Sequence, residues 1–350
     1  MLVAGGGPAG SIAALELRRH GFSVALIEQD NYQTFRLGET LPPSIRATLT
    51  ALGLWEQFLA CGPLESYGIR SAWESSAPRD QDFVHNPYGC GWHVDRARFD
   101  AMLASAAAQA GARLFMSARV SSWRKQPDRQ WQLEVTQAGT VLSLSGRMLV
   151  DATGRRALLA AKLGSQTRAV DRLIAAVALS HCPDAKQWTL IEAEKEGWWY
   201  SAPLPGDRMV FAYMTDSDLW KSAKWAELME LAPLTAQRAR RTHIPIPTEI
   251  VSAGSLIRQP IAGPDWVAIG DAAMAFDPLS GQGVLKSMDT GTRGARAIAR
   301  YFDGDSSSLA TYQNWVQETY QAHLSIRSQF YQSVRRWLAS SRFWTRRESR

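Results

Sequence analysis

The chain has 350 residues and a globular composition, with 45% hydrophobic and 21% charged residues. Its net charge is +6, but residues 335–350 alone hold six Arg and one Glu, so the rest is nearly neutral. That distribution argues against a nucleic-acid partner, because nucleic-acid binding needs basic residues spread across a face of the fold. No run reaches the roughly 18 apolar residues that a transmembrane segment needs.

The first 28 residues predict a strand, a glycine-rich turn, a helix and a second strand. Apolar residues 2–4 form the first strand and residues 23–27 the second. In a G-x-G-x-x-G turn, the first glycine permits the tight bend, the second admits a pyrophosphate and the third lets helix and strand pack closely. A terminal acidic residue accepts ribose hydroxyls. The dinucleotide-site candidates are Gly5, Gly7, Pro8, Ala9, Gly10 and Glu28.

Two later segments distinguish a flavin from a nicotinamide. Residues 148–156, MLVDATGRR, predict a strand ending in Asp151 and Gly154. Residues 265–291, DWVAIGDAAMAFDPLSGQGVLKSMDTG, predict a strand, a Gly-Asp pair, a loop and a helix. With the first motif, they resemble the FAD-dependent group that includes aromatic hydroxylases, geranylgeranyl-type reductases and flavin halogenases.

The resemblance implies how FAD is held. Asp271 would accept a ribityl hydroxyl, and residues 278–283 would lie beside the isoalloxazine. A helix N-terminus there would stabilise the negative charge of reduced flavin. Lys286, just inside that helix, either reaches the flavin edge or is solvated. The remaining cofactor candidates are Arg36, Thr40, Arg96, Val120, Asp151, Gly154, Gly270, Pro278, Gly281, Gln282, Gly283 and Val284.

Three of these candidates carry their own reasoning. Arg96, in a D-R-x-x-F-D string, is placed against the cofactor by the resemblance, and its alternative is a helix-entry pair with Asp100. Val120 comes at the end of a strand expected over 113–120. The resemblance places it where the FAD-dependent group holds the adenine of the cofactor by backbone contacts. Thr40, with Glu39 in G-E-T, lies near the flavin or caps a loop.

The implied fold class is α/β with an α+β second domain. Residues 1–72, 94–162 and 258–304 form a Rossmann-like FAD-binding domain of the aromatic hydroxylase and glutathione-reductase type. Residues 73–93 and 163–257 form the substrate domain, and 305–350 a C-terminal helical basic tail.

The substrate domain is expected to contain an antiparallel sheet. Short apolar runs within 171–217 alternate with turn residues, and PGD at 205–207 predicts a hairpin. A helix is expected over 225–241. Within GWWYSAPLPG, alternation directs Trp198 and Tyr200 to one face and Trp199 to the other.

Two features argue against halogenation. Flavin halogenases carry W-x-W-x-I-P over the isoalloxazine; here Trp198 and Pro203 match, but Tyr200 and Ala202 do not. Halogenases also need a lysine in the N-terminal third, whereas the first lysine here is Lys125. Arginine cannot replace it, because its high pKa leaves no neutral nucleophile.

Further segments resemble the LodB-like flavoproteins that help mature quinone-cofactor oxidases: GETLPPSIRATLTALGLWEQF, SYGIRSAWES, GWHVDRARFD, GWWYSAPLPG and RRWLASSRFWTRR. The resemblance implies an FAD monooxygenase that hydroxylates an aromatic ring through a flavin C4a-hydroperoxide, specifically a Trp side chain of a partner polypeptide. O2 is the co-substrate, and NAD(P)H or a partner flavin reductase supplies electrons. The substrate-chamber candidates are Glu39, Trp73, Trp92, Trp198 and Tyr200.

Several alternatives stay open. They are a reductase of the geranylgeranyl-reductase type, a flavin halogenase and a non-catalytic flavin-binding assembly factor. No general acid or base is identified: His85 and His93 lie in the expected substrate domain, but lone histidines are more often structural.

The tail and the cysteines suggest the setting of the protein. The basic, aromatic tail suits docking to an acidic partner, a membrane surface or its own protein. Cys61, Cys90 and Cys182 have neither metal-ligand nor redox spacing, so we expect reduced thiols, no metal and a cytoplasmic location.

Overall fold

The computed structural model describes the chain except residues 184, 241, 243–246 and 349–350. The end of the expected helix at Arg241, parts of the expected substrate domain and the last two tail residues therefore lie outside the described residues.

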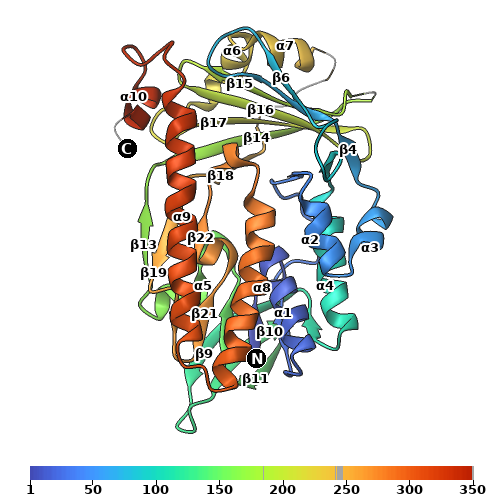
Figure 1. Ribbon diagram of the computed structural model, residues 1–350, viewed down its shortest axis with the longest axis vertical. Coiled ribbons are helices and arrows are strands. Elements are labelled where there is room, and N and C mark those ends of the chain that lie inside the picture. The colour runs from blue at the N-terminus through green and yellow to red at the C-terminus, as the bar shows by residue number, and fades with distance from the viewer. Residues whose placement is uncertain (184, 241, 243–246, 349–350) are drawn as a thin grey trace.

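A largely parallel sheet forms the base of the molecule (Figure 1). Five of its six strands among the described residues run parallel, as in a Rossmann-like fold, and the short edge strand is antiparallel. The strand order is β20 (Ala262–Gly263), β21 (Trp266–Ala268), β12 (Leu149–Asp151), β1 (Leu2–Ala4), β2 (Ala25–Ile27) and β8 (Arg113–Phe115).

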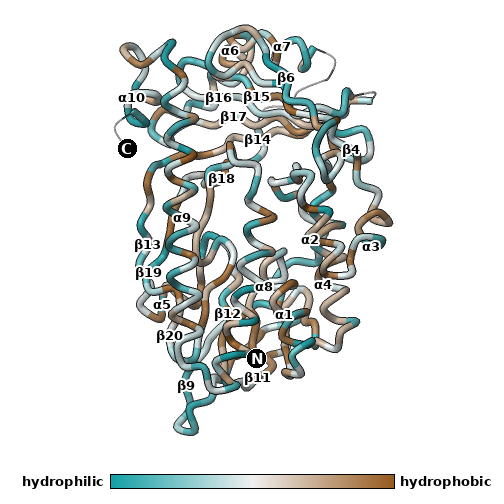
Figure 2. The backbone as a smooth tube through the Cα atoms, in the orientation of Figure 1, coloured by the Kyte–Doolittle hydropathy of each residue, from teal (hydrophilic) through white to brown (hydrophobic). Residues whose placement is uncertain are grey.

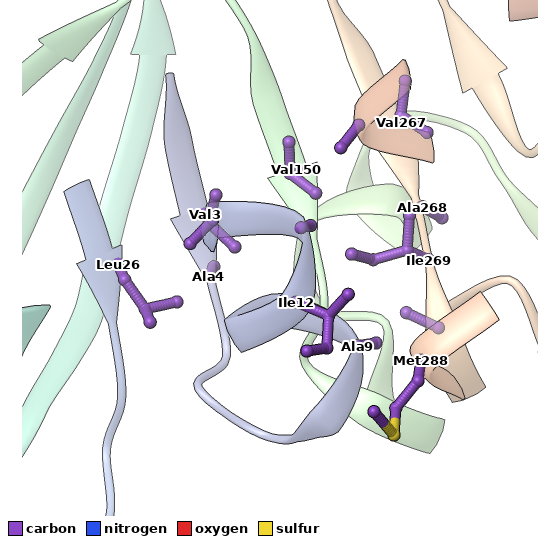
Figure 3. Close-up of a cluster of buried hydrophobic side chains, with 14 of the residues drawn as sticks. Val3, Ala4, Ala9, Ile12, Leu26, Val150, Val267, Ala268, Ile269 and Met288 are labelled. Atoms are coloured by element: carbon purple, nitrogen blue, oxygen red, sulfur yellow. The ribbon is translucent and has the colours of Figure 1, made fainter. Parts of the chain in front are cut away.

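Three helices cover this sheet closely. They are α1 (Pro8–Arg19), α4 (Arg96–Gln109) and α8 (Gly283–Phe302). Figure 3 shows Ile12 and Ala9 of α1, Val3 of β1, Val150 of β12 and Met288 of α8 meeting in one buried cluster. The α/β fold class is confirmed.

A second sheet lies across the other end of the molecule. Its seven strands among the described residues are β18 (Glu249–Ser252), β14 (Leu173–His181), β17 (Arg208–Asp216), β16 (Gly197–Leu204), β15 (Trp188–Glu194), β5 (Gly68–Ala72) and β6 (Arg79–Asp82). The hairpin at 205–207 joins β16 to β17, pairing Leu204 with Arg208. Figure 2 shows hydrophobic segments where β14 and β17 cross the molecule.

This sheet has two distinct faces. We call the face with Trp198 and Tyr200 the inner face, and the face with Trp199 and Tyr213 the outer face. The outer face is covered by α6 (Trp225–Glu230) and α7 (Pro233–Ala239). The predicted alternation along β16 is confirmed, since Trp198 and Trp199 lie in separate clusters.

The remaining strands build three smaller sheets. The first contains β9 (Ala118–Lys125), β10 (Trp131–Gln137) and β11 (Thr140–Gly146); the second contains β13 (Gln166–Ala169), β19 (Leu256–Gln259) and β22 (Met274–Ala275). The third contains β3 (Thr40–Leu41), β4 (Leu64–Ser66) and β7 (Gly91–His93), next to α2 (Ile45–Ala51) and α3 (Trp55–Ala60). A short helix, α5 (Leu158–Lys162), follows β12.

The C-terminal helices join the two ends of the molecule. Figure 1 shows α9 (Ser308–Gln332) running along one side from the parallel sheet to the seven-stranded sheet, where α10 (Arg342–Glu348) follows. Within the described residues, every helix is too short or too polar to span a membrane.

Three sequence expectations need correction. The strand expected over 113–120 is interrupted after Phe115, because the chain turns at Ser117 with a φ of 51°. The helix expected from Trp225 breaks at Pro233, which cannot continue a helix but can begin one. The seven-stranded sheet is not wholly antiparallel, since β5, within 1–72, runs parallel to β15.

Candidate flavin site and the sheet above it

Close backbone contacts bring the three flavin motifs together. A Cβ on Gly5, whose φ is 103°, would lie 2.2 Å from the Ala152 carbonyl oxygen. A Cβ on Gly270 would lie 2.7 Å from the Ala9 Cβ. The three motifs therefore meet at the carboxyl ends of the parallel strands. They are the glycine-rich turn after β1, the segment after β12 and the Gly-Asp pair after β21.

The same test shows where a cofactor has room. A Cβ on Gly10 would lie 1.8 Å from the Gly5 carbonyl oxygen, so that position serves packing. A Cβ on Gly7 would meet nothing within 4 Å, and the same is true of Gly281 and Gly283 at the start of α8. At these three motif glycines the backbone is open to the close approach of a ligand, as a dinucleotide site requires.

Two helix N-termini point to an anionic ligand. Among the described residues, no side-chain hydrogen bond caps α1 or α8. The same is true of α2 and α9, but at α1 and α8 the open Gly7, Gly281 and Gly283 leave room beside the N-terminus. Uncapped N–H groups together with the helix dipole favour bound negative charge. The residues present at these two helix N-termini therefore fit FAD.

Glu28 lies at the end of β2, beside the glycine-rich turn. Its carboxylate accepts the backbone N–H of Gly6 at 2.6 Å, and Arg36 lies 3.4 Å from it. The Tyr32 hydroxyl donates to the Gly6 carbonyl at 2.9 Å. Tyr32 carries no sequence signal, because its place depends on a left-handed φ of 60° after the strand.

Asp271 sits among cations at the Gly-Asp pair. Lys286 Nζ lies 2.5 Å from its carboxylate and donates to the Met274 carbonyl, while Arg155 lies 3.6 Å away. Burial alone would raise the pKa of Asp271, but Lys286 and Arg155 outweigh it and hold that pKa below its usual range. Lys286 is buried, so its solvated alternative is wrong.

The other cofactor candidates occupy varied positions. Asp151 is buried and accepts the backbone N–H groups of Leu159 and Ala160, so it organises the start of α5. Arg96 forms the anticipated pair with Asp100 and donates to the Leu37 carbonyl. Val120 is buried on β9. Gly154 has a left-handed φ and open space beside it.

The flavin-side loop 277–283 is anchored by the C-terminal helix. Asp277 accepts from Arg327 Nε at 3.1 Å and from the Tyr331 hydroxyl at 2.9 Å, both on α9. Arg327 also pairs with Asp171. His323, on the same helix, stacks on Phe276 with ring centroids 3.9 Å apart. These α9 residues were missed because nothing local in the helix sequence marks them.

The aromatic chamber candidates do not form one wall. Trp73 and Trp198 meet edge to face at 5.8 Å, and Trp344 packs on Trp73 from the tail. Trp198 has no exposed surface. Trp92 instead lies against Trp55 and Phe58 in the core of the other half.

Glu39 and Tyr200 do come together. Tyr200 donates its hydroxyl proton to the buried Glu39 carboxylate, and the Thr40 hydroxyl lies 2.6 Å from the Tyr200 oxygen. His93 is buried nearby, whereas His85 is exposed.

Comparison with known proteins identifies the family. The model of the FAD binding domain matches residues 1–324. The chain belongs to this family. Its fold class and motifs are those of FAD-dependent oxidoreductases.

Relatives of several kinds share this family. LodB of Marinomonas mediterranea is 29% identical over 99% of this chain and 96% of its own. The myxobacterial chondrochloren halogenase CndH covers 99% of this chain and 85% of its own, with 21% identity and a TM-score of 0.88. The peptidyl tryptophan dihydroxylase QhpG covers 99% and 77%, with 21% identity and a TM-score of 0.81. The two structural matches show a common fold.

The C-terminal tail of this family member folds onto its own sheet. Phe343, Trp344 and Arg347 are buried, and Trp344 Nε1 donates to the Glu194 carbonyl at 2.9 Å. Arg347 pairs with Asp216 at 2.7 Å. Of the alternatives for the tail, these aromatic residues follow the one in which it folds back on its own protein, and they complete the inner-face core.

Proposed function

We propose that this FAD-dependent oxidoreductase is a monooxygenase that hydroxylates an aromatic ring, specifically a Trp side chain of a partner polypeptide. The observation that carries the proposal is the fold shared over 99% of the chain with a peptidyl tryptophan dihydroxylase. Its likeness to LodB over nearly the full length of both chains supports the FAD-dependent oxidoreductase part of the proposal. Bound FAD, once reduced, supplies the activation of O2.

The cofactor residues act by position. The open backbone at Gly7 and the N-terminus of α1 would hold the diphosphate, Glu28 the ribose, and Asp271 the ribityl chain. Loop 277–283, fixed by Arg327, would hold the ring. The inner face of the seven-stranded sheet would exclude water and orient the substrate. The residues proposed to contact FAD all fall within the proposed FAD-binding ranges 1–72, 94–162 and 258–304.

Halogenation is the second candidate, since halogenases are among the relatives in both sequence and structure. Two observations weigh against it. No lysine precedes Lys125, and Lys125 pairs with Asp265, on the loop before β21. Lys286, the buried lysine at the flavin motifs, is bonded to Asp271.

One reaction mixture separates the candidates. It contains the FAD-loaded chain, NAD(P)H with a general flavin reductase, oxygen, chloride, bromide and a synthetic peptide with one Trp. Mass spectrometry then reports the modification. Incorporation of oxygen from 18O2 supports the monooxygenase, whereas a halogenated or unmodified peptide rejects it. Omitting the reductase tests whether NAD(P)H reduces the flavin directly. The proposed location is cytoplasmic.

A further inference from the structure

A continuous chain of hydrogen bonds crosses the junction between the two ends of the molecule. It begins at His93 on β7, whose Nδ1 lies 3.0 Å from the Thr40 hydroxyl. Thr40 contacts Tyr200 on β16, and Tyr200 donates to Glu39. The backbone N–H of Gly38 donates to the other Glu39 oxygen at 2.8 Å. Segments far apart in the sequence thus meet at one carboxylate.

The chain of hydrogen bonds has a preferred direction. Burial, with Arg238 nearby, lowers the pKa of His93 to about 3, so this ring is neutral. Its Nε2 is buried and has no partner among the described residues. An unmet acceptor is less costly there than an unmet donor, so we assign the ring proton to Nδ1. Each group then donates to the next, and the last acceptor is Glu39.

Tyr200 and Thr40 are the less buried members of this chain of hydrogen bonds. Glu39 and His93 are buried, whereas Tyr200 and Thr40 are partly exposed. A Cβ on Gly38, next to Glu39, would lie 3.9 Å from Val284 at the start of α8. Tyr200 and Leu279 of the flavin-side loop both pack against the inner-face cluster. Tyr200 therefore lies on the side of the sheet that carries the segments proposed to hold the flavin.

The identity of residue 200 decides what this group can do. A phenol oxygen accepts one proton while releasing its own, whereas an indole N–H is a donor only. The halogenase string W-x-W-x-I-P has Trp where this chain has Tyr200. The substitution turns a position unable to pass a proton into one that can.

The geometry points to Tyr200 and Glu39 as the proton relay of the hydroxylation. This inference rests on the proposed function and assigns the acid–base groups it lacks. When a ring carbon gains its C–O bond, its C–H bond breaks and that electron pair returns to the ring. The proton passes to the Tyr200 oxygen as the Tyr200 proton passes to Glu39. O2 is the oxidant and reduced flavin the electron donor, and the second oxygen atom leaves as water.

The charges around Glu39 suit this role. Burial raises the pKa of Glu39, although the Tyr200 hydroxyl, the Gly38 N–H and Arg96 oppose that rise. The positive charge of Arg238, on α7, lowers the pKa of His93 and also acts on Tyr200. A carboxylate with a raised pKa is a stronger base and accepts a proton more readily than an ordinary glutamate. Turnover should therefore increase with pH as Glu39 loses its proton.

The outer face offers a matched control. Tyr213 donates to Glu194 at 2.8 Å, and both residues are buried. This second Tyr–Glu pair has the same chemistry but lies against Trp199 in the outer-face cluster. Its variants test whether any buried Tyr–Glu bond influences turnover through stability alone.

The test compares Glu39→Gln and Tyr200→Phe with Glu194→Gln and Tyr213→Phe. FAD-loaded full-length proteins receive a single-Trp peptide with either a normal or a ring-deuterated indole. We expect kcat to fall about 100-fold in Glu39→Gln and Tyr200→Phe, with KM unchanged. A ring-deuterium isotope effect should appear only in these two, because ring-proton loss becomes rate-limiting. Both control variants should keep wild-type kcat.

The outcomes separate two failures. A wild-type protein that leaves the peptide unmodified overturns the proposed function and this inference together. A wild-type protein that hydroxylates it, with Glu39→Gln and Tyr200→Phe matching the controls, overturns this inference alone. The dependence of the wild-type kcat on pH gives a test that does not require the variants to fold. A kcat that does not rise through the acid range also overturns the relay.

Discussion

The two faces of the seven-stranded sheet carry similar residues under different covers. Each face has a fully buried tryptophan, Trp198 inside and Trp199 outside, and each has a tyrosine bonded to a glutamate. The outer face is covered by α6 and α7, which follow β17 directly in sequence. The inner face is covered by residues from the beginning and the end of the chain.

This difference shows how a site arises from an ordinary sheet. A local cover closes the outer face into a core, so its polar groups serve only structure. The distant cover of the inner face brings Glu39, the α9 anchor of loop 277–283 and the tail to one place. Function should therefore respond to changes on the inner face and stability to changes on both.

The largest expected effect comes from the two tryptophans. Trp198→Ala and Trp199→Ala should each lower the free energy of unfolding by about 3–5 kcal/mol, because each opens a large buried cavity. Only Trp198→Ala should weaken FAD binding, since Trp198 Nε1 donates to Tyr331, which holds Asp277. Denaturant unfolding and flavin-fluorescence titration measure the two quantities. Equal losses of FAD affinity would contradict the division between the faces.

Arg327→Met tests the anchor of the flavin-side loop. Removing this cation leaves Asp171 and Asp277 buried with less compensation. We expect the free energy of unfolding to fall by about 3 kcal/mol, at the lower end for a broken buried pair, because Tyr331 still donates to Asp277. FAD affinity should fall as well, as measured by equilibrium titration. Arg240→Met, at an exposed pair with Glu230 beside the outer face, is the control and should change neither.

The sequence predicted the features of the site that depend on residues close together in the chain. The roles of Gly5 and Gly10 are demands of one tight turn, and the alternation of Trp198 and Trp199 follows from strand geometry. The contact between Glu39 and Tyr200 depends on how two distant strands dock, which no local pattern specifies. Arg327 and His323 were missed for the same reason, because α9 has no motif.

The acid response of His93, which is hydrogen-bonded through Thr40 to the inner-face Tyr200, should differ from that of the outer face. The pKa of His93 falls from 6.5 to about 3 in the folded protein. Between these values the unfolded chain binds one more proton, so stability falls as pH falls, by about 1.4 kcal/mol per pH unit. His93→Gln should remove that contribution from the slope of unfolding free energy against pH. Tyr213→Phe, on the outer face, should leave the slope unchanged, and an unaltered slope in His93→Gln would refute the assignment.

Tyr213→Phe should have the smallest effect on stability. The change removes the hydroxyl that donates to Glu194, but the backbone N–H of Glu196 still donates to the same carboxylate oxygen at 3.0 Å. Because that oxygen keeps a partner, we expect a loss of about 1 kcal/mol, near the lower limit for a buried hydrogen bond. Tyr200→Phe should cost more, about 2 kcal/mol, because the Gly38 N–H bonds the other Glu39 oxygen, so the oxygen bonded to Tyr200 and the Thr40 hydroxyl each lose this partner. Denaturant unfolding of both variants measures the two losses. Equal losses would contradict this difference between the two Tyr–Glu pairs.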